Sequence, residues 1–394
     1  MGKWKMVRLG DVCSKTKKDN PSSHYRTIAY IAISSIDSEN KKIISYNTMS
    51  SKEAPSRARQ IVFPGDILVS TVRPNLNAVA IIDTMQSNLI ASTGFCVLRP
   101  NKNFIIKKYL FEYLKSQSFI NSMSQQATGA SYPAVSDKIV LNEYIPLPPL
   151  EVQQKIATVL DRASALIDFR KAQIDKLDLL IKSQFIEMFG LPGSNNGKWK
   201  LYRLGDCCEL NPKKSSDSRL TSDLTVSFIP MSSISENGSI NTTIQRSYDE
   251  VKTGFTYFMD SDVLFAKITP CMENGKGAIA KELCNGVGFG STEFHVLRPI
   301  KGKSNSYWLY TLTTLKHFRI DAATNMTGSA GQRRVPATFL ENYKVSLPPI
   351  SLQNEFAAFV KQVEAQKKLL QQSLSELELN YKSLMQKCFR GEIF

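Results

Sequence analysis

The chain contains a tandem internal repeat, and this repeat limits the possible folds more than any other feature of the sequence. The string KWKMVRLGDVC at residues 3–13 returns as KWKLYRLGDCC at residues 198–208, with 8 of 11 positions identical. Because four such matches keep their order at a spacing of 195 to 200 residues, they predict a duplicated unit of about 200 residues. The other three pairs are GDILVSTVRPN (65–75) with SDVLFAKITPC (261–271), STGFCVLRP (92–100) with STEFHVLRP (291–299), and LPP (147–149) with LPP (347–349).

Each half begins with a globular region, at residues 1–150 and 191–349. Short apolar runs broken by Gly, Pro, Asn and Ser are typical of β-strands joined by turns. One amphipathic helix is predicted late in each region, near residues 106–123 and 307–322. A double proline then ends the last strand and permits a helix directly beyond it.

Two long helices are predicted after the double prolines, at residues 151–190 and 350–394, because apolar residues recur there at spacings of three and four. The alternative to a coiled coil is two helices that pack separately on their own domains. Tandem copies of one unit imitate a two-fold dimer, in which each helix pairs antiparallel with its copy. The expected fold class is therefore α+β, with two pseudo-two-fold-related α/β domains separated by two long antiparallel coiled-coil helices. The predicted seam contains Ile156, Leu160, Ala163, Ile167, Ile174, Leu177, Ile181, Phe356, Val360, Val363, Leu370, Leu374, Leu377, Tyr381 and Leu384.

The positive charge lies on the globular regions. The whole chain has a net charge of +15, of which residues 1–150 carry +9 and residues 191–349 carry +5. The predicted helices at 151–190 and 350–394 carry 0 and +1. Two basic modules on a nearly neutral spacer suggest two contacts with the phosphate backbone of one DNA duplex.

Motifs of the enzyme classes that we considered are missing from the sequence. There is no phosphate-binding G-x-x-x-x-G-K-[ST] string, and no N-P-P-aromatic string of amino-methyltransferases. Gly286, Gly288 and Gly290 form G-x-G-x-G, but a strand-like run follows where a dinucleotide site needs a helix. No catalytic residue is predicted, and we expect the chain not to be an enzyme by itself.

Metal binding, membrane insertion and export are not expected either. The seven cysteines form no C-x-x-C pair and only three histidines are present, so no metal site is predicted. The thiols are interpreted as small buried side chains in a reducing cytoplasm. No run approaches the ~20 apolar residues that span a bilayer, and the start MGKWKMVRLGD lacks the apolar core of a signal peptide. The expected location is therefore the cytoplasm.

Polar and basic loops between the predicted strands are the candidate DNA-contacting segments, at residues 70–77, 128–133, 266–277 and 327–336. Arg can bond guanine bidentately, Asn and Gln can bond adenine, and Lys, Ser and Thr suit phosphates. The string RLGD is the same in both halves and cannot specify two different sequences, so we expect it to be structural. The predicted DNA-binding residues are Ser70, Thr71, Arg73, Asn75, Asn77, Thr128, Ser131, Tyr132, Lys267, Thr269, Asn274, Lys276, Gln332, Arg333 and Arg334.

The order of these motifs resembles the specificity subunit of a bacterial Type I restriction–modification system. The order is W-K-x-x-R-L-G-D, [GS]-D-x-L, S-T-x-F-x-V-L-R-P, then L-P-P with Gln153, Gln154 or Gln353 shortly after it, and a long helix. FIEMFG (185–190) and CFRGEIF (388–394) are similar to that family's helix ends. The resemblance covers essentially the whole chain. The second repeat resembles a recurring type of target-recognition domain, whereas the first lacks its G-Q-R-R string.

The resemblance implies a non-catalytic reader of double-stranded DNA. Residues 1–150 and 191–349 would be target-recognition domains that each read one half of a bipartite site, and the helices would set the gap. Two modification subunits would carry S-adenosylmethionine and methylate adenine, so that no cofactor is expected in this chain, and restriction subunits could join the complex. The alternatives are a self-contained nucleic-acid enzyme with an unrecognised active site and a coiled-coil scaffold that binds only protein.

Overall fold

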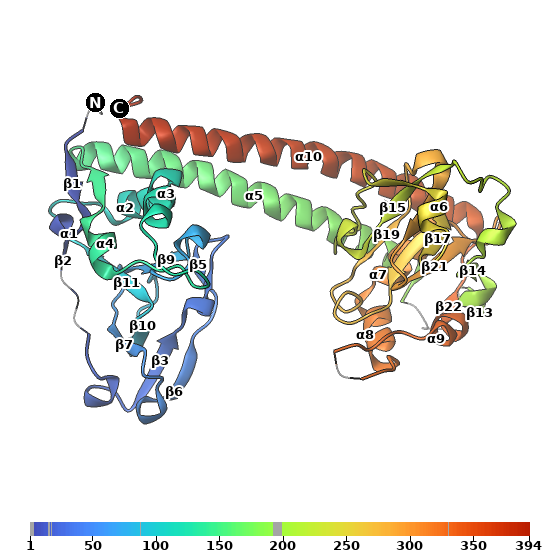
Figure 1. Cartoon of the computed structure of the whole chain (residues 1–394), viewed down its shortest axis with the longest axis horizontal. Coiled ribbons are helices and arrows are strands. Elements are labelled where there is room, and N and C mark those ends of the chain that lie inside the picture. Colours follow the sequence, from blue (N-terminus) through green and yellow to red (C-terminus); the bar gives the residue numbers. More distant parts are fainter. Residues whose placement is uncertain (1–3, 15, 17, 87, 192–198, 330) are drawn as a thin grey trace. The chain divides into compact units, whose positions relative to one another are not determined.

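The computed structural model describes residues 4–14, 16, 18–86, 88–191, 199–329 and 331–394 (Figure 1). Contacts divide the chain into two compact units: unit 1 is Met1–Arg170 with Ser373–Phe394, and unit 2 is Lys171–Gln372. Each unit therefore combines one globular repeat with a part of both long helices. Lys3 and Lys198, which begin the first pair of repeated strings, lie outside the described residues.

Unit 1 contains two four-stranded sheets and a two-stranded sheet that joins the start of the repeat to its end. The first four-stranded sheet has the order β6 (Asn47–Ser50), β3 (Thr27–Ile31), β10 (Leu89–Ser92), β7 (Ala58–Ile61), in which β3 and β10 are parallel. The second is antiparallel, with the order β2 (Cys13–Ser14), β11 (Phe95–Pro100), β8 (Ile67–Ser70), β9 (Val79–Ile81). The remaining elements are the pair β1 (Met6–Arg8) and β12 (Tyr144–Pro146), the hairpin β4 (Ile36–Asp37) and β5 (Lys42–Ile43), and helices α1 (Leu9–Val12), α2 (Lys107–Leu114), α3 (Gln117–Gln125) and α4 (Asp137–Asn142).

Unit 2 repeats these three sheets element by element. Its first four-stranded sheet has the order β16 (Gln245–Ser247), β15 (Thr225–Ile229), β20 (Val287–Gly290), β17 (Thr256–Met259), again with one parallel pair, β15 and β20. The second has the order β14 (Cys208–Leu210), β21 (Phe294–Pro299), β18 (Val263–Ala266), β19 (Gly277–Ile279). The remaining elements are the pair β13 (Leu201–Arg203) and β22 (Lys344–Ser346), and helices α6 (Tyr248–Val251), α7 (Ser306–Thr314), α8 (Lys316–Thr324) and α9 (Ala337–Asn342).

The uninterrupted apolar runs form the middle layer of each unit. Every residue of β8 is buried, because successive side chains of a strand point to opposite faces and both faces are covered. Ile67 and Val69 pack in the cluster that contains the helical residues Tyr109 and Ile156, whereas Leu68 packs toward the other four-stranded sheet. β18 divides its side chains between two clusters in the same way. Each unit is therefore built as helices, sheet and sheet.

Two of the repeated motifs are explained by one buried ion pair. The carboxylate of Asp66 accepts two hydrogen bonds from Arg99, at 2.8 and 2.7 Å, and Asp262 accepts the same two from Arg298 at the same distances. The Asp side chains are 2% and 1% exposed. A buried carboxylate needs a charged partner and further donors, so the Asp of [GS]-D-x-L and the Arg of L-R-P recur together.

The repeated string RLGD also has a structural role, as predicted. Its leucine is buried in both units, at Leu9 and Leu204. The amide of Leu9 donates to the carbonyl of Glu143 at 2.9 Å, and the amide of Leu204 donates to that of Tyr343 at 2.8 Å. RLGD thereby ties the beginning of each repeat to the residues that precede its last strand.

Each half has two shorter helices where one amphipathic helix was expected. In unit 1 the prediction of one helix near 106–123 is wrong because Ser116 is extended and its hydroxyl caps α3, accepting from the amide of Phe119 at 3.3 Å. In unit 2 the helix expected near 307–322 is broken at Leu315, which is also extended and lies between α7 and α8. In unit 1, local capping by Ser116 therefore interrupts a continuous apolar pattern.

The glycine-rich string before β21 serves packing. A Cβ on Gly288 would lie 2.2 Å from the ring of Phe258, and one on Gly290 would lie 2.2 Å from the carbonyl oxygen of Ile229. These glycines let neighbouring groups approach the backbone of β20, in agreement with the prediction that a strand follows them.

The two long helices are α5 (Leu150–Phe189) and α10 (Ile350–Arg390). In unit 1, Met385 of α10 shares a core with Leu160, near the start of α5. In unit 2, Phe185 near the end of α5 packs against Phe356 near the start of α10, with ring centroids 5.5 Å apart. The helices therefore pair antiparallel within each unit. All of the predicted seam residues are buried or half-buried: Ile156, Leu160, Ala163, Ile167, Ile174, Leu177, Ile181, Phe356, Val360, Val363, Leu370, Leu374, Leu377, Tyr381 and Leu384.

A glutamine at the start of each long helix fixes that helix to its own repeat. Gln153 is fully buried; its Oε1 accepts from the amide of Ile106 at 2.9 Å, and its Nε2 donates to the carbonyls of Phe104 and Pro148 at 3.0 and 2.9 Å. Gln353 makes the equivalent three bonds in unit 2. None of the helices in the described part of the chain has the length and apolar character that crossing a bilayer requires.

Candidate nucleic-acid interface

In unit 1 the two loops predicted from the sequence are joined by their backbones. We call residues 70–77 loop 1 and residues 128–133 loop 2 of this unit. The amide of Arg73 donates to the carbonyl of Pro133 at 2.7 Å, and the amide of Val135 donates to that of Thr71 at 2.9 Å. The structure thus brings together two segments that lie more than fifty residues apart in the sequence.

Arg73 and Tyr132 stack on one another at the exposed side of this joined surface. Arg73 has a left-handed backbone, with φ of 49°, and its guanidinium carbon lies 4.9 Å from the centre of the Tyr132 ring. Tyr132 is 68% exposed. A planar cation stacked on an aromatic ring is oriented for bidentate hydrogen bonds while its donors remain accessible. Asn75, Thr128 and Ser131, which were also predicted to contact DNA, are exposed as well.

Three other predicted residues of unit 1 are buried, which differs from the contact role expected of them. The hydroxyl of Ser70 donates to the carbonyl of Val72, and that of Thr71 donates to the carbonyl of Gly94, both at 2.9 Å. Asn77 has a left-handed backbone, and its side-chain nitrogen has no hydrogen-bond partner among the described residues. Since their side chains are turned inward, these residues shape loop 1 in this conformation.

Unit 2 joins its two loops in the same place. Here loop 1 is residues 266–277 and loop 2 is residues 327–336, of which Ala330 lies outside the described residues. The amide of Thr269 donates to the carbonyl of Arg333 at 3.0 Å, and the amide of Val335 donates to that of Lys267 at 2.9 Å. Both repeats therefore present a composite surface made from equivalent loops of different sequence.

The arginine pair of loop 2 is held by neighbours. Arg333 donates to the carbonyls of Ala323 and Met326, at 3.0 and 3.1 Å, and is half-buried. Arg334 binds both carboxylate oxygens of Glu293, with shortest distances of 2.8 and 2.9 Å. Hydrogen bonding from Arg334 lowers the pKa of Glu293. A guanine edge or a phosphate would therefore compete with the Glu293 carboxylate for the hydrogen bonds that Arg334 donates.

The other predicted residues of unit 2 differ in exposure. Asn274 and Gln332 are exposed, whereas Lys267, Thr269 and Lys276 are half-buried. The hydroxyl of Thr269 donates to Glu273 at 2.8 Å, and the ammonium of Lys276 lies 3.4 Å from the carbonyl oxygen of Met231.

A buried arginine that we did not predict supports loop 1 of unit 2. Arg319, on α8, donates to the carbonyls of Met272 and Gly275 at 2.8 and 3.3 Å, and its guanidinium carbon lies 4.7 Å from the centre of the Phe265 ring. Burial lowers its pKa to about 10. The sequence signal that could have identified Arg319 is its charge within the apolar pattern of residues 307–322.

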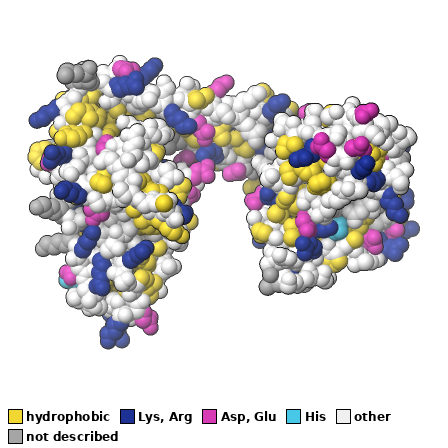
Figure 2. Space-filling model, viewed as in Figure 1, with side chains coloured by type: hydrophobic (Ala, Val, Ile, Leu, Met, Phe, Trp, Pro, Cys, Tyr) yellow, Lys and Arg dark blue, Asp and Glu magenta, His cyan; other side chains and the backbone are white. Residues whose placement is uncertain are grey.

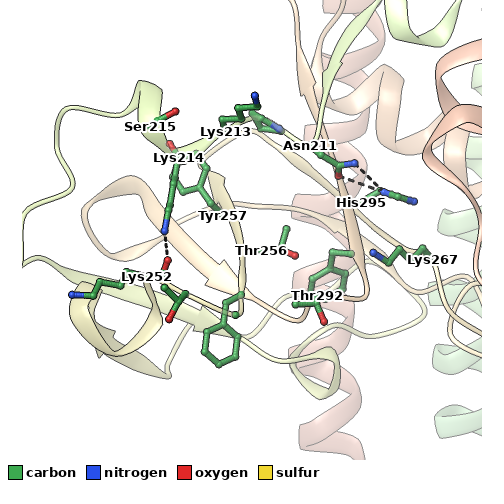
Figure 3. A pocket seen from close by; sticks show the side chains of 15 residues that line it. Asn211, Lys213, Lys214, Ser215, Lys252, Thr256, Tyr257, Lys267, Thr292 and His295 are labelled. Carbon is green, nitrogen blue, oxygen red and sulfur yellow. Dashed lines mark hydrogen bonds between the residues drawn. The ribbon is translucent and has the colours of Figure 1, made fainter.

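Beside loop 1 of unit 2 lies a basic cavity of about 640 Å³, which we call the lysine cavity. Lys213, Lys214, Lys252 and Lys267 line it, and none of the described residues that line it is acidic. Figure 3 shows Lys214 and Lys252 on one side and Lys267 with His295 on the other. On the face of unit 2 seen in Figure 2, Lys and Arg side chains lie among acidic, uncharged polar and apolar ones.

His295 at this cavity is fixed and favours the neutral form. Its Nε2 lies 2.8 Å from the carbonyl oxygen of Val335, and its Nδ1 lies 3.2 Å from the side-chain nitrogen of Asn211. Burial lowers its pKa, and the nearby Lys267 acts in the same direction.

The described residues form no metal centre, and their cysteines are free thiols. No group of three or more His, Cys, Asp and Glu side chains among them is placed to hold a metal ion. The seven cysteines are free, and four of them, Cys96, Cys207, Cys208 and Cys388, are buried. Burial raises the pKa of the Cys208 thiol to about 12, which favours the unreactive protonated form.

Comparisons with known proteins identify relatives in one family. The specificity subunit of the Type I restriction enzyme EcoEI of Escherichia coli is 36% identical over 249 residues, which are 62% of this chain and 40% of that protein. The EcoAI specificity subunit, also from Escherichia coli, is 39% identical over 185 residues, 46% of this chain and 30% of that protein. The chain thus spans less than half the length of these two relatives.

Two further matches extend over the whole chain. The putative Type I restriction enzyme MjaX specificity subunit of Methanocaldococcus jannaschii is 22% identical over 99% of this chain and 93% of that protein. A solved chain from work on the complex assembly and conformational transition of the type I R-M system is 26% identical, covers 99% of this chain and 98% of its own length, and has a TM-score of 0.62.

The family model described as the Type I restriction modification DNA specificity domain matches residues 1–179 and matches again at residues 196–379. These two matches coincide with the two sequence repeats and with the repeated order of strands in the sheets. The chain therefore belongs to the family of Type I restriction modification DNA specificity domains, and it carries that domain twice.

Proposed function

We propose that the chain is the sequence-specific DNA-binding subunit of a Type I restriction–modification complex in the cytoplasm. Each unit reads one half of a bipartite site in double-stranded DNA, and the two long helices set the gap between the halves. The chain is not itself catalytic. S-adenosylmethionine and adenine methylation belong to two modification subunits, and restriction subunits add cleavage.

One observation carries this proposal: both units join the same two loops by the same backbone bonds, but the loops differ in sequence. The frameworks have equivalent strand orders and share RLGD, the buried Asp–Arg pair and the buried glutamine. Identical frameworks with different exposed polar loops are suited to reading two different short sequences, because base-edge contacts specify sequence whereas phosphate contacts do not.

The surface of the long helices supports the proposal that the chain binds protein partners. Leu166, Phe169 and Leu379 in unit 1 are 56%, 61% and 66% exposed. In unit 2, Leu179 and Leu369 are 61% and 66% exposed. Large apolar side chains exposed along both helices are more typical of a contact surface for other subunits than of a helix pair that remains in water.

The division of labour between the units is tested by matched loop variants. In the complex reconstituted with its modification subunits, R333A/R334A alters unit 2 and R73A alters unit 1. Sequencing of the methylated adenines in genomic DNA reports which bases remain specified. We expect each variant to relax one half-site and leave the other unchanged. Equal relaxation of both halves by either variant contradicts the proposal.

The alternative functions are tested with the chain alone. Turnover of S-adenosylmethionine by the purified chain with DNA and Mg²⁺, at a rate matching that of the complex, would show a self-contained enzyme. Absence of salt-dependent DNA binding by the reconstituted complex would favour a scaffold that binds only protein, since contacts with phosphates make affinity fall as salt rises.

A further inference from the structure

The last part of loop 1 has the same backbone arrangement in both units. Asn77 lies two residues before β9, and Gly275 lies two residues before β19. Both have left-handed backbones, with φ of 48° and 88°, and the amide of each donates to a carbonyl three positions earlier at 3.0 Å. The carbonyls of Asn77 and Gly275 are therefore equivalent acceptors, at the point where each recognition loop returns to its sheet.

Each of these two carbonyls accepts a hydrogen bond from a cationic side chain outside the loop. The ammonium of Lys41 donates to the carbonyl of Asn77 at 2.7 Å, and the guanidinium of Arg319 donates to that of Gly275 at 3.3 Å and to that of Met272 at 2.8 Å. Lys41 is half-buried and Arg319 is 8% exposed. Burial lowers the pKa of Lys41 to about 8, so the ammonium form still predominates at pH 7.

The two cations come from different places in the repeat. Lys41 ends the string SENK (38–41) in the hairpin of β4 and β5, and the equivalent string in unit 2 is SENG, which ends at Gly238. A Cβ on Gly238 would collide with the hydroxyl of Tyr310. Unit 2 therefore has no side chain at the position of the lysine, and the hydroxyl of Tyr310 fills the adjacent space.

The position of Arg319 is apolar in unit 1. Arg319 is the fourth residue of α8, and Ile120 is the fourth residue of α3, which also packs against loop 1 of its unit. A buried charge is costly unless it is compensated. Within the described part of the chain, Arg319 has loop carbonyls and the ring of Phe265 as partners but no ion pair. Since Ile120 shows that the fold accepts an apolar residue here, the guanidinium is explained by the loop carbonyls.

The backbone that these cations hold carries side chains that are predicted to read bases. Asn274 is exposed and lies between the two carbonyls that Arg319 holds. In unit 1 the exposed Asn75 lies two positions before the carbonyl that Lys41 holds. An asparagine selects adenine through two hydrogen bonds that both need correct geometry. A loop that is fixed before it meets DNA loses less conformational entropy when it forms them.

We infer that Arg319 and Lys41 are positioning residues for sequence recognition: each holds the end of loop 1, so that the exposed side chains of the loop meet the bases in one conformation. This inference rests on the proposed function. The two residues act through the loop backbone, and contact with the bases remains with the loops. Removing either cation should therefore weaken discrimination between sequences in one half-site only.

The test removes each cation and compares it with an exposed lysine nearby. K41M is paired with K42M in the same hairpin, and R319M is paired with K316M in the same helix. Each full-length variant is assembled with its modification subunits. The methylated sequence of the wild-type complex is identified first, and methylation rates are then measured on this site and on duplexes with one base pair changed in either half.

The equivalent positions of the other unit show that the fold accommodates these changes. Gly238 stands at the position of Lys41 without a side chain, and Ile120 stands at the position of Arg319 with an apolar one. K41R and R319K keep a cation beside the loop carbonyls and serve as the conservative variants.

The expected result is a loss of discrimination in one half-site for each variant. R319M should lose about 5- to 150-fold of the preference for the correct base pair in the half-site that unit 2 reads, which is the value of one good contact with a base edge. K41M should lose as much in the other half-site, and K41R and R319K should keep the preference. The salt dependence of DNA binding should not change in K41M or R319M, because no phosphate contact is removed.

Two outcomes overturn the inference. One is discrimination by K41M and R319M that equals that of K42M and K316M; a shallower salt dependence would then assign the two cations to direct phosphate contacts. The other is a loss that is equal in both half-sites, since a positioning residue acts only on the loop of its own unit. Neither outcome refutes the proposed function, which fails instead if the wild-type complex methylates no bipartite site.

Discussion

The buried glutamine at the start of α5 allows a direct measurement of how strongly each long helix is fixed to its repeat. Replacing Gln153 by Ala removes one acceptor and two donated hydrogen bonds at once. The amide of Ile106 and the carbonyls of Phe104 and Pro148 then lose their hydrogen-bond partner. Gln153 is fully buried, so the site is shielded from solvent. Leaving a buried polar group unpaired costs about 1–3 kcal/mol. We therefore expect Q153A to lower the free energy of unfolding of unit 1 by at least about 3 kcal/mol.

The neighbouring Gln154 provides a matched control. It is the same residue type on the same turn, but it is exposed, and its side-chain nitrogen donates to the hydroxyl of Thr158, at 3.2 Å. Q154A should change stability by about 0.5 kcal/mol or less, as surface substitutions commonly do. Q353A in unit 2 should repeat the large loss seen for Q153A, because its three bonds are equivalent.

Urea unfolding followed by circular dichroism measures the total loss in each variant. Hydrogen exchange of the α2 amides then locates the loss in unit 1, since Gln153 bonds the residue that precedes α2. Equal unfolding midpoints for Q153A and Q154A would refute the reasoning. They would mean that the three bonds contribute no more than an exposed side chain.

Two further predictions concern pH and length. Because burial lowers the pKa of His295 from its ordinary value of 6.5, the unfolded chain binds a proton that the folded chain refuses; stability is then fully present above about pH 6.5 and falls below it. H295Q should reduce the dependence of Tm on pH below about pH 6.5, and an unchanged pH profile would contradict this. Deleting one heptad from both α5 and α10 shortens the helices by ~10 Å and should shorten the tolerated gap in the methylated site by about three base pairs. Methylome sequencing checks it, and an unaltered gap would contradict the proposed spacing role.

Much of the architecture could be predicted because the same sequence patterns occur in both repeats. The buried strands β8 and β18 were visible as apolar runs, and the double prolines marked where α5 and α10 begin. The break between α2 and α3 was not visible, because one serine hydroxyl that caps a helix outweighs an apolar periodicity that continues through it.

The candidate site was predicted in its parts but not in its assembly. Both loops of each unit were identified, yet the bond from Arg73 to Pro133 depends on pairing across sixty positions that no local pattern reveals. The inward-facing side chains of Ser70 and Thr71 depend on the same closure. The lysines of the lysine cavity come from three separate segments, so in the sequence they look like ordinary surface lysines.

The division of each long helix between two units has a consequence for the order in which the protein can form. The core of unit 1 contains Met385 and Cys388, and the hydroxyl of Tyr381 donates to Glu112, 269 positions earlier, at 2.5 Å. A ribosome makes the whole globular part of unit 2 before it reaches these residues. Contacts over such separations require late closure of a very long loop. The unit that is synthesised first is therefore the one whose core is completed last.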